Sequence, residues 1–284
     1  MTNRELLTSF VGAYPAQPAT AFWRAIEIGA LARHGLPGGL GLDLGCGDGI
    51  LTDILLRETG RRTLVGVDVD PLETQAAARF PFYRRVHTCP GDRIPEPDGS
   101  FDFVLSNSVL EHIPNLEATI AEIARLLRKN GRFLFTVPGP GFHDNLAGSV
   151  LPHVDRKTYL DVIDRRLAHY HYLSPEDWRA LCARNDLVLD SCLGYLDGRE
   201  TRRWETLSRM TGGLLYALFG GGRRPIEIQR RLGARDLQNR KRLPMPMARA
   251  IARLVSAGVP IDVNASTWIQ LDAASCLLVE GHRT

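Results

Sequence analysis

Residues 42–49, Leu-Asp-Leu-Gly-Cys-Gly-Asp-Gly, place three glycines at alternate positions after a short apolar run. A glycine has no Cβ, so such a turn can adopt positive φ angles and a ligand can approach its backbone closely. Apolar residues at helical spacing then predict a helix over 50–58. A strand, a glycine turn and a helix in this order are typical of the nucleotide-binding end of a doubly wound α/β fold.

The residues between the glycines indicate which ligand the turn would hold. Dinucleotide-binding proteins use Gly-x-Gly-x-x-Gly and seat a pyrophosphate on the helix N-terminus. Here Gly49 comes one position earlier, and the carboxylate of Asp48 would repel a phosphate. S-adenosylmethionine suits this turn because it has an ammonium and a sulfonium and no phosphate. A tight turn that binds no ligand is the alternative.

A second strand is predicted over 62–69, where β-branched residues are frequent. Asp68 lies near its end, about 20 positions past the glycines, where a carboxylate can accept hydrogen bonds from ribose hydroxyls. Asp70 competes for this role. Because Pro71 follows it, Asp70 is better explained as the N-cap of the next helix.

Polar residues follow the next apolar segment. Residues 101–105 predict a buried strand that leads into Ser106 and Asn107. Ligands of open α/β sheets bind beyond the carboxyl ends of the strands, so these two side chains should face the same crevice as the glycine turn. A helix is predicted over 115–129, and a further strand over 132–137.

Four segments together resemble the class I S-adenosylmethionine-dependent methyltransferases: LDLGCGDG, VGVDV, DGSFDFVLSNSVLEHI and LLRKNGRFLFTVPG. They follow the family's order over roughly residues 38–138. The resemblance implies an α/β fold, doubly wound and Rossmann-like, with a seven-stranded sheet, an antiparallel last strand and helical insertions that form a lid or cap. It also implies S-adenosylmethionine as the cofactor, with S-adenosylhomocysteine as the product.

The resemblance also implies which residues hold the cofactor. The glycine turn would hold its amino-acid end, Asp68 the ribose, and Val69 would lie against the adenine. The full set is Asp43, Gly45, Cys46, Gly47, Asp48, Gly49, Asp68, Val69, Asp92, Ser106 and Asn107. Asp92 departs from the family's pattern because it lies closer to the following Ile-Pro. The adenine amine contact is therefore left open between Asp92 and a backbone group.

Three histidines are candidate catalytic residues, since histidine is the natural general base near neutral pH. His112 follows the strand of the third segment, near where the reacting methyl should lie, although a structural role at the next helix is equally open. His143 and His171 are second choices in a ring-rich stretch over 138–173. The pair His169-x-His171 has no matching ligand set, so no metal is predicted.

Composition favours a reduced, cytoplasmic protein. The five cysteines are scattered, and no two form a Cys-x-x-Cys pair. The N-terminus lacks the apolar core of a signal peptide, and the uncharged tract 210–222 is too short to span a bilayer. The predicted domains are an N-terminal lid helix (1–37), a methyltransferase core (38–195 and 269–284) and a basic helical insertion or cap (196–268).

The insertion is unusually basic. Residues 197–253 contain 14 Lys or Arg and five Asp or Glu, in a chain whose net charge is +3. Beside the apolar tract 214–219, such a segment suits peripheral contact with a membrane or an anionic amphipathic ligand through 199–253. A solvated helical cap and RNA binding are the alternatives, and no DNA contact is expected.

The predicted function is methyl transfer to oxygen, nitrogen or carbon of a small-molecule acceptor: a lipid-like compound, a glycan or a specialised metabolite. Two lid-like insertions favour a small molecule. Three alternatives stay open: a protein that binds the cofactor without methyl transfer or catalyses another reaction, an RNA methyltransferase that uses the basic insertion, and a nicotinamide-dependent oxidoreductase. The glycine spacing and Asp48 argue against the last. Neither the acceptor nor the oligomeric state is predicted.

Overall fold

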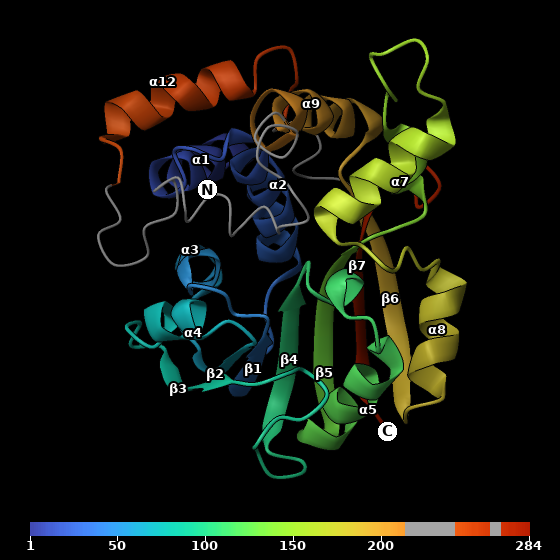
Figure 1. Ribbon diagram of the computed structural model, residues 1–284. Coiled ribbons are helices and arrows are strands. Elements are labelled where there is room, and N and C mark those ends of the chain that lie inside the picture. Colours follow the sequence, from blue (N-terminus) through green and yellow to red (C-terminus); the bar gives the residue numbers. More distant parts are fainter. Residues whose placement is uncertain (214–241, 262–267) are drawn as a thin grey trace. The chain divides into compact units, whose positions relative to one another are not determined.

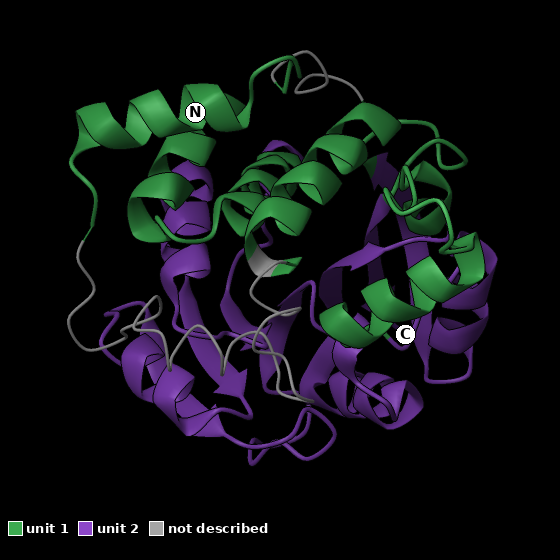
Figure 2. Cartoon of the chain, turned by 45° about the horizontal axis from the view of Figure 1, so that its top comes forward, with its two compact units in different colours: residues 1–30, 141–169, 195–275 green, residues 31–140, 170–194, 276–284 purple. Residues whose placement is uncertain are grey.

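The computed structural model describes residues 1–213, 242–261 and 268–284. The chain divides into two compact units, which Figure 2 colours separately. Unit 1 comprises residues 1–30, 141–169 and 195–275, and unit 2 comprises residues 31–140, 170–194 and 276–284. In the described residues, no helix combines the length and the apolar character that crossing a bilayer requires.

Unit 2 contains a seven-stranded sheet with the order β3-β2-β1-β4-β5-β7-β6 (Figure 1). Its neighbouring strands from β1 to β5 are parallel, and β7 is antiparallel to β5. The strands are β1 (Leu40–Leu44), β2 (Thr63–Asp68), β3 (Tyr83–Thr88), β4 (Phe101–Asn107), β5 (Leu127–Pro138), β6 (Leu187–Tyr195) and β7 (Cys276–Arg283). This arrangement confirms the predicted α/β fold with its antiparallel last strand.

Unit 2 also contains helices, some of which begin at a capping side chain. They are α3 (Ile50–Thr59), α4 (Pro71–Ala77), η1 (Leu110–His112), α5 (Leu116–Leu126) and α8 (Pro175–Ala183). Asp70 caps α4 by accepting hydrogen bonds from the backbone N–H groups of Leu72 and Glu73, as predicted. Both α5 and α8 contribute to one apolar cluster on the sheet, in which Ile120 and Trp178 are buried.

The boundary between α5 and β5 differs from the predicted one. The helix ends at Leu126, and Leu127 is already extended, with φ −68° and ψ 138°. Leu127 pairs with Phe101, while the main register of β5 against β4 resumes at Arg132. The helix was predicted to continue to residue 129 from the spacing of its apolar residues. In the structure, Leu127 instead pairs with β4, so β5 begins inside the predicted helix.

Unit 1 is helical in the part that the structure describes. Its helices are α1 (Asn3–Ala13), α2 (Pro18–His34, whose last turn belongs to unit 2), α6 (Gly141–Asn145), α7 (Arg156–Leu167), α9 (Gly198–Ser208), the π-helical turn η2 (Arg209–Gly213) and α12 (Met245–Val255). Residues 1–37 thus form two helices where one was predicted. Trp23, Phe142 and Trp204 pack edge-on at the centre of this unit. The apolar tract 214–219 lies outside the described residues.

Candidate active site

The glycine turn after β1 is tied to the end of β2. The backbone N–H groups of Gly45 and Cys46 both donate to the carbonyl oxygen of Val67, at 2.7 and 2.9 Å. The N–H of Gly49 donates back to the carbonyl of Cys46 at 3.0 Å, and α3 begins at the next residue. The backbone of the turn is therefore held in one conformation by hydrogen bonds that need no side chain.

Gly47 differs from its neighbouring glycine in the space beside it. A Cβ added at Gly45 would lie 2.2 Å from the side chain of Val109. A Cβ added at Gly47 would meet nothing closer than Oε2 of Glu73, at 3.9 Å. Gly47 has a φ of +51°, which favours glycine. Open space beside a backbone of this kind is where a ligand could come closest to the turn.

Asp68, at the end of β2, holds the centre of the turn. Its carboxylate accepts hydrogen bonds from the backbone N–H groups of Gly47, at 3.0 Å, and Asp70, at 2.9 Å. Burial raises the pKa of Asp68, and these two hydrogen bonds oppose the rise. Each carboxylate oxygen receives one of the two bonds, so each retains a lone pair for a further donor such as a ribose hydroxyl.

The other two carboxylates of the segment face inward. Asp43 is buried and accepts hydrogen bonds from the hydroxyls of Thr52, at 2.6 Å, and Tyr83, at 2.5 Å. Burial raises the pKa of Asp43. Asp48 accepts a hydrogen bond from the backbone N–H of Ile50 at 3.1 Å. Both side chains thus stabilise the turn and the start of α3, in addition to any role toward a ligand.

Cys46 behaves as a small apolar side chain. It is buried, and desolvation together with the nearby carboxylates of Asp43 and Asp68 raises the pKa of its thiol. A thiol in such surroundings stays protonated and is a poor nucleophile. This agrees with the interpretation of Cys46 as a packing residue within the turn.

Asn107, at the end of β4, has an unsatisfied polar group. Its Oδ1 accepts a hydrogen bond of 2.8 Å from the hydroxyl of Thr136 on β5. Its Nδ2 is buried and has no hydrogen-bond partner among the described residues. A buried donor without a partner is costly, so this amide is available to an acceptor on a bound ligand or a water molecule.

The remaining predicted contacts divide into buried and exposed ones. Ser106 is fully buried, and its hydroxyl donates to the carbonyl of Leu44 at 3.1 Å, which joins the ends of β1 and β4. Val69 is 62% exposed directly after Asp68, as an apolar contact for a flat ring would require. Asp92 is exposed in the loop that follows β3.

The three candidate histidines are in different settings. His112 is 39% exposed at the end of η1, with Nε2 3.9 Å from Oε1 of Glu111. His171 donates from Nε2 to the backbone carbonyl of Ile113 at 2.8 Å, so its ring is fixed by that contact. His143 belongs to unit 1 and pairs with Asp164 on α7 at 2.9 Å. Of the three, His112 and His171 thus lie in the same unit as the glycine turn.

Three further residues were not predicted. Thr52 and Tyr83 fix Asp43, and Thr136 orients Asn107. Tyr83 and Thr136 act on residues 40 and 29 positions away along the chain, and Thr52 acts on one nine positions away. The only local signal was a hydroxyl in an otherwise apolar stretch, which alone does not identify its partner.

The described residues fit S-adenosylmethionine. Asn107 offers an unpaired amide donor, the backbone at Gly47 is open, and Val69 is exposed beside the carboxylate of Asp68. These groups follow β1, β2 and β4, three neighbouring parallel strands whose carboxyl ends meet at one edge of the sheet (Figure 1). This edge is where ligands of doubly wound sheets bind.

The chain is similar to known methyltransferases. A family model described as a methyltransferase domain matches residues 26–191. A malonyl-acyl-carrier-protein O-methyltransferase of Halorhodospira halophila is 33% identical over 111 residues, which cover 38% of each protein. A ubiquinone biosynthesis O-methyltransferase of Xanthomonas oryzae pv. oryzae is 29% identical over 172 residues, 58% of this chain and 69% of that protein. The chain spans half the length or less of three curated relatives that it matches, including the Halorhodospira protein.

Solved structures share the fold at low identity. The cyclase SpnF superposes with a TM-score of 0.53 and 15% identity, and the match covers 91% of this chain and 80% of that protein. Likeness at this level shows a common architecture and leaves the reaction open.

Proposed function

Because the chain belongs to the class I S-adenosylmethionine-dependent methyltransferase family, we propose that it methylates a small-molecule acceptor. The observation that carries this proposal is the open backbone at Gly47, held by the carboxylate of Asp68. When bound, S-adenosylmethionine supplies a methyl group that its sulfonium makes electrophilic. The protein's part is to hold the reactants in line and to exclude water.

The proposed cofactor contacts follow from the geometry. The turn over Gly45–Gly49 would receive the amino-acid end, with the amide of Asn107 donating to it from the end of β4. Asp68 would accept hydrogen bonds from the ribose hydroxyls through its remaining lone pairs. Val69 would lie against the adenine, and Asp92 or a backbone group of its loop would contact the adenine amine.

Relatives favour an oxygen acceptor. The two reported above are named as O-methyltransferases, one for a malonyl-acyl carrier protein and one in ubiquinone biosynthesis. A carboxyl acceptor is already ionised near neutral pH and needs no base, whereas a hydroxyl acceptor loses a proton during or before transfer. His112 is the proposed acceptor of that proton, because it is partly exposed and follows β4 within unit 2.

The proposal is tested by calorimetric binding of S-adenosylhomocysteine to the wild type, Asp68→Ala and Asn107→Ala. Loss of a hydrogen bond to a ligand in a buried site weakens binding by about 10- to 100-fold. Asp53→Ala is the matched control, since it removes a carboxylate of α3 that is paired with Arg57. The absence of binding to the wild type would refute the proposed function.

His112→Gln tests the catalytic role in a methylation assay with a panel of hydroxyl acceptors, and carboxyl acceptors, which need no base, serve as the control. Loss of a general base lowers kcat by about 10²- to 10⁴-fold and removes the base's limb from the pH profile. Affinity for S-adenosylhomocysteine should stay unchanged. An unaltered kcat would exclude His112 as the base, while the cofactor proposal would stand.

A second candidate function is a reaction other than methyl transfer on the same cofactor site. It is suggested by SpnF, a protein of the same fold that is described as a cyclase. Cofactor binding without methylation of any acceptor in the panel would support it. The RNA methyltransferase alternative depends on the basic insertion, of which residues 214–241 and 262–267 lie outside the described part of the chain.

A further inference from the structure

Helix α12 presents an apolar surface to solvent. It packs on α1 through one side, where Ala248 and Ala252 are buried. On another side of the helix, Met247 is 53% exposed and Leu254, seven positions later, is 70% exposed, and Met245 is 53% exposed as the first residue of the helix. Large apolar side chains that gather on one short element while exposed to this degree indicate an interaction surface.

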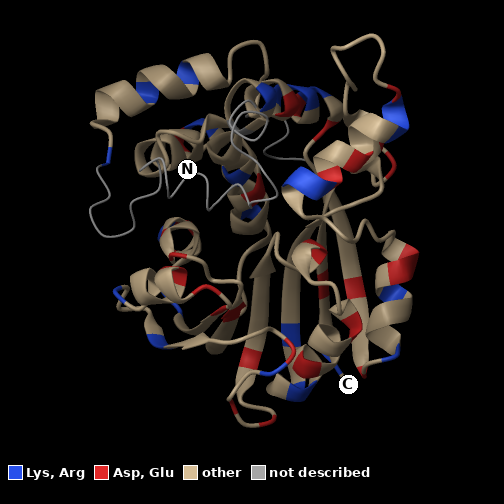
Figure 3. Ribbon diagram, viewed as in Figure 1, with Lys and Arg blue, Asp and Glu red and all other residues tan. Residues whose placement is uncertain are grey.

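The same helix is positively charged. Arg249 and Arg253 are exposed and lie one turn apart on it, and residues 242–261 contain no Asp or Glu. Figure 3 shows the charge on α12 as Lys and Arg alone. Within the described part of the chain, neither guanidinium is paired with a carboxylate. Arginines beside an apolar helical face are typical of helices that lie in the interface of an anionic membrane.

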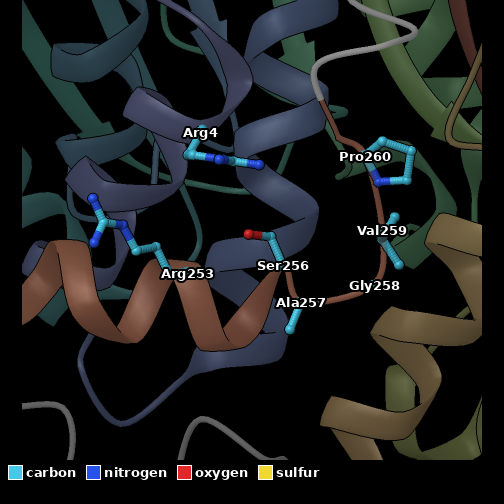
Figure 4. A pocket seen from close by; sticks show the side chains of 7 residues that line it. All are labelled: Arg4, Arg253, Ser256, Ala257, Gly258, Val259 and Pro260. Carbon is cyan, nitrogen blue, oxygen red and sulfur yellow. The ribbon is translucent and has the colours of Figure 1, made fainter.

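A cavity of about 350 Å³ opens at the C-terminal end of α12 (Figure 4). Arg4 of α1 and Arg253 line it, together with Ser256 and the turn over residues 257–260. Arginine binds phosphate through charge-assisted hydrogen bonds, and Arg253 belongs both to the lining of this cavity and to the exposed surface of α12. One ligand with a phosphate and apolar chains therefore suits this helix.

We propose that α12 docks on a membrane that contains anionic phospholipid. Leu254 and Met247 would enter the boundary between headgroups and acyl chains. Arg249 and Arg253 would contact lipid phosphates. The surface is independent of methyl transfer, since it shares no residue with the proposed cofactor site. It assigns to α12 the membrane contact that the sequence predicted for 199–253 as a whole.

Co-flotation of the full chain with two kinds of vesicle tests this proposal. One kind is phosphatidylcholine alone, and the other contains one third phosphatidylglycerol. We expect binding to the anionic vesicles, weak binding to the neutral ones, and release at high salt, because exposed charges are screened. Failure of the wild type to bind anionic vesicles would overturn the proposal.

Two double variants separate the charged from the apolar contribution. Arg249→Ala/Arg253→Ala should weaken binding by about 10-fold or more, since each basic residue near an anionic surface contributes about fivefold. Met247→Ser/Leu254→Ser should weaken it by a similar factor. Arg165→Ala/Arg179→Ala and Val162→Ser are the matched controls, since they alter exposed residues of α7 and α8. All variants should retain the wild-type circular dichroism and melting temperature.

The remaining outcomes also decide the matter. If only the arginine variant loses binding, α12 recognises an anion without inserting, and bilayer docking is refuted. If RNA homopolymer displaces the vesicles and binds in an arginine-dependent, Met247-independent way, the surface is one for nucleic acid. If neither double variant differs from its control, another part of the chain holds the membrane, and the assignment to α12 is wrong.

Discussion

The carboxylate of Asp68 accepts a hydrogen bond of 3.0 Å from the backbone N–H of Gly47, 21 positions earlier in the chain. This bond joins the end of β2 to the centre of the turn after β1. It means that an acidic residue at this position both shapes the glycine turn and offers lone pairs to a ligand. The residue that would recognise the ribose is therefore also the one that holds the backbone beneath the amino-acid end.

Gly47→Ala should weaken the binding of S-adenosylhomocysteine. The new methyl group would occupy the space into which the ligand fits, and overpacking of this kind costs about 1–3 kcal/mol, or about 10- to 100-fold in affinity. A positive φ adds strain of about 1 kcal/mol to the fold. Calorimetry and urea unfolding measure the two effects.

Gly60→Ala is the control for this strain. Gly60 has a φ of +89° at the C-cap of α3. The atom nearest to a Cβ added there would be Nη1 of Arg62, at 3.5 Å. Its ψ of 160° adds to the strain, so Gly60→Ala should lose at least as much stability as Gly47→Ala, without a change in affinity. Equal ligand binding by Gly47→Ala and Gly60→Ala would show that the space above Gly47 is not part of the cofactor site.

Thr136→Val should affect the cofactor through Asn107. Valine keeps the shape of threonine but removes the hydroxyl that orients the Asn107 amide. We expect a loss of about 1 kcal/mol in the free energy of unfolding and a several-fold loss in affinity for S-adenosylhomocysteine. Thr119→Val, at another buried threonine whose hydroxyl bonds the backbone within α5, should lower stability alone. If both variants bind the ligand normally, Thr136 does not position Asn107.

Glu200→Gln should flatten the pH dependence of stability. Burial raises the pKa of Glu200 to about 7, while its side chain accepts a hydrogen bond from the N-cap Asp197. The unfolded chain releases this proton at lower pH than the folded one, so the free energy of unfolding falls as pH rises from about 4.5 to about 7. Above pH 7 the ionised Glu200 lowers the free energy of unfolding by a constant amount, about 3 kcal/mol.

Thermal melting from pH 5 to pH 8 measures this effect. Glutamine is neutral throughout and can still accept the bond from Asp197, so the variant should gain stability at pH 8 and little at pH 5. Glu176→Gln, at an exposed glutamate of α8, should alter neither the slope nor the melting temperature appreciably. A wild-type slope retained in Glu200→Gln would contradict the assigned titration.

Arg24→Met should destabilise unit 1 more than the loss of a surface ion pair would. Arg24 and Glu27 lie three positions apart on α2, where their side chains are neighbours. In the structure the pair forms at 2.5 Å, but Glu27 is fully buried and also accepts a hydrogen bond from Tyr195. Removal of the arginine leaves a buried carboxylate with less compensation, which costs about 3 kcal/mol.

Urea unfolding distinguishes this pair from an exposed one. Arg57→Met removes an exposed pair with Asp53 on α3 and should cost no more than about 0.5 kcal/mol. The double variant Arg24→Met/Glu27→Leu should recover part of the loss, because no buried charge remains. Equal costs for Arg24→Met and Arg57→Met would mean that burial of Glu27 does not matter to stability.

Several elements were predictable because their determinants are local. The glycine turn, the cap formed by Asp70 before Pro71 and the strand that ends in Asn107 each depend on residues within a few positions of one another. Their order along the chain then indicated the fold and the edge of the sheet where a cofactor would bind. The boundary at Leu127 was missed because pairing with β4 outweighed the local helical pattern.

By itself, the sequence determined the class of fold, the turn at Gly45–Gly49 and the acidic residue that follows it, because backbone propensity and periodicity act over short distances. Only the tertiary structure decided three other features. Asp68 accepts a hydrogen bond from Gly47, Thr136 bonds the side-chain oxygen of Asn107 while its Nδ2 has no partner among the described residues, and Glu27 is buried. Such features depend on which distant segments pack together. Burial and hydrogen-bond satisfaction are properties of that packing, and no short stretch of sequence contains them.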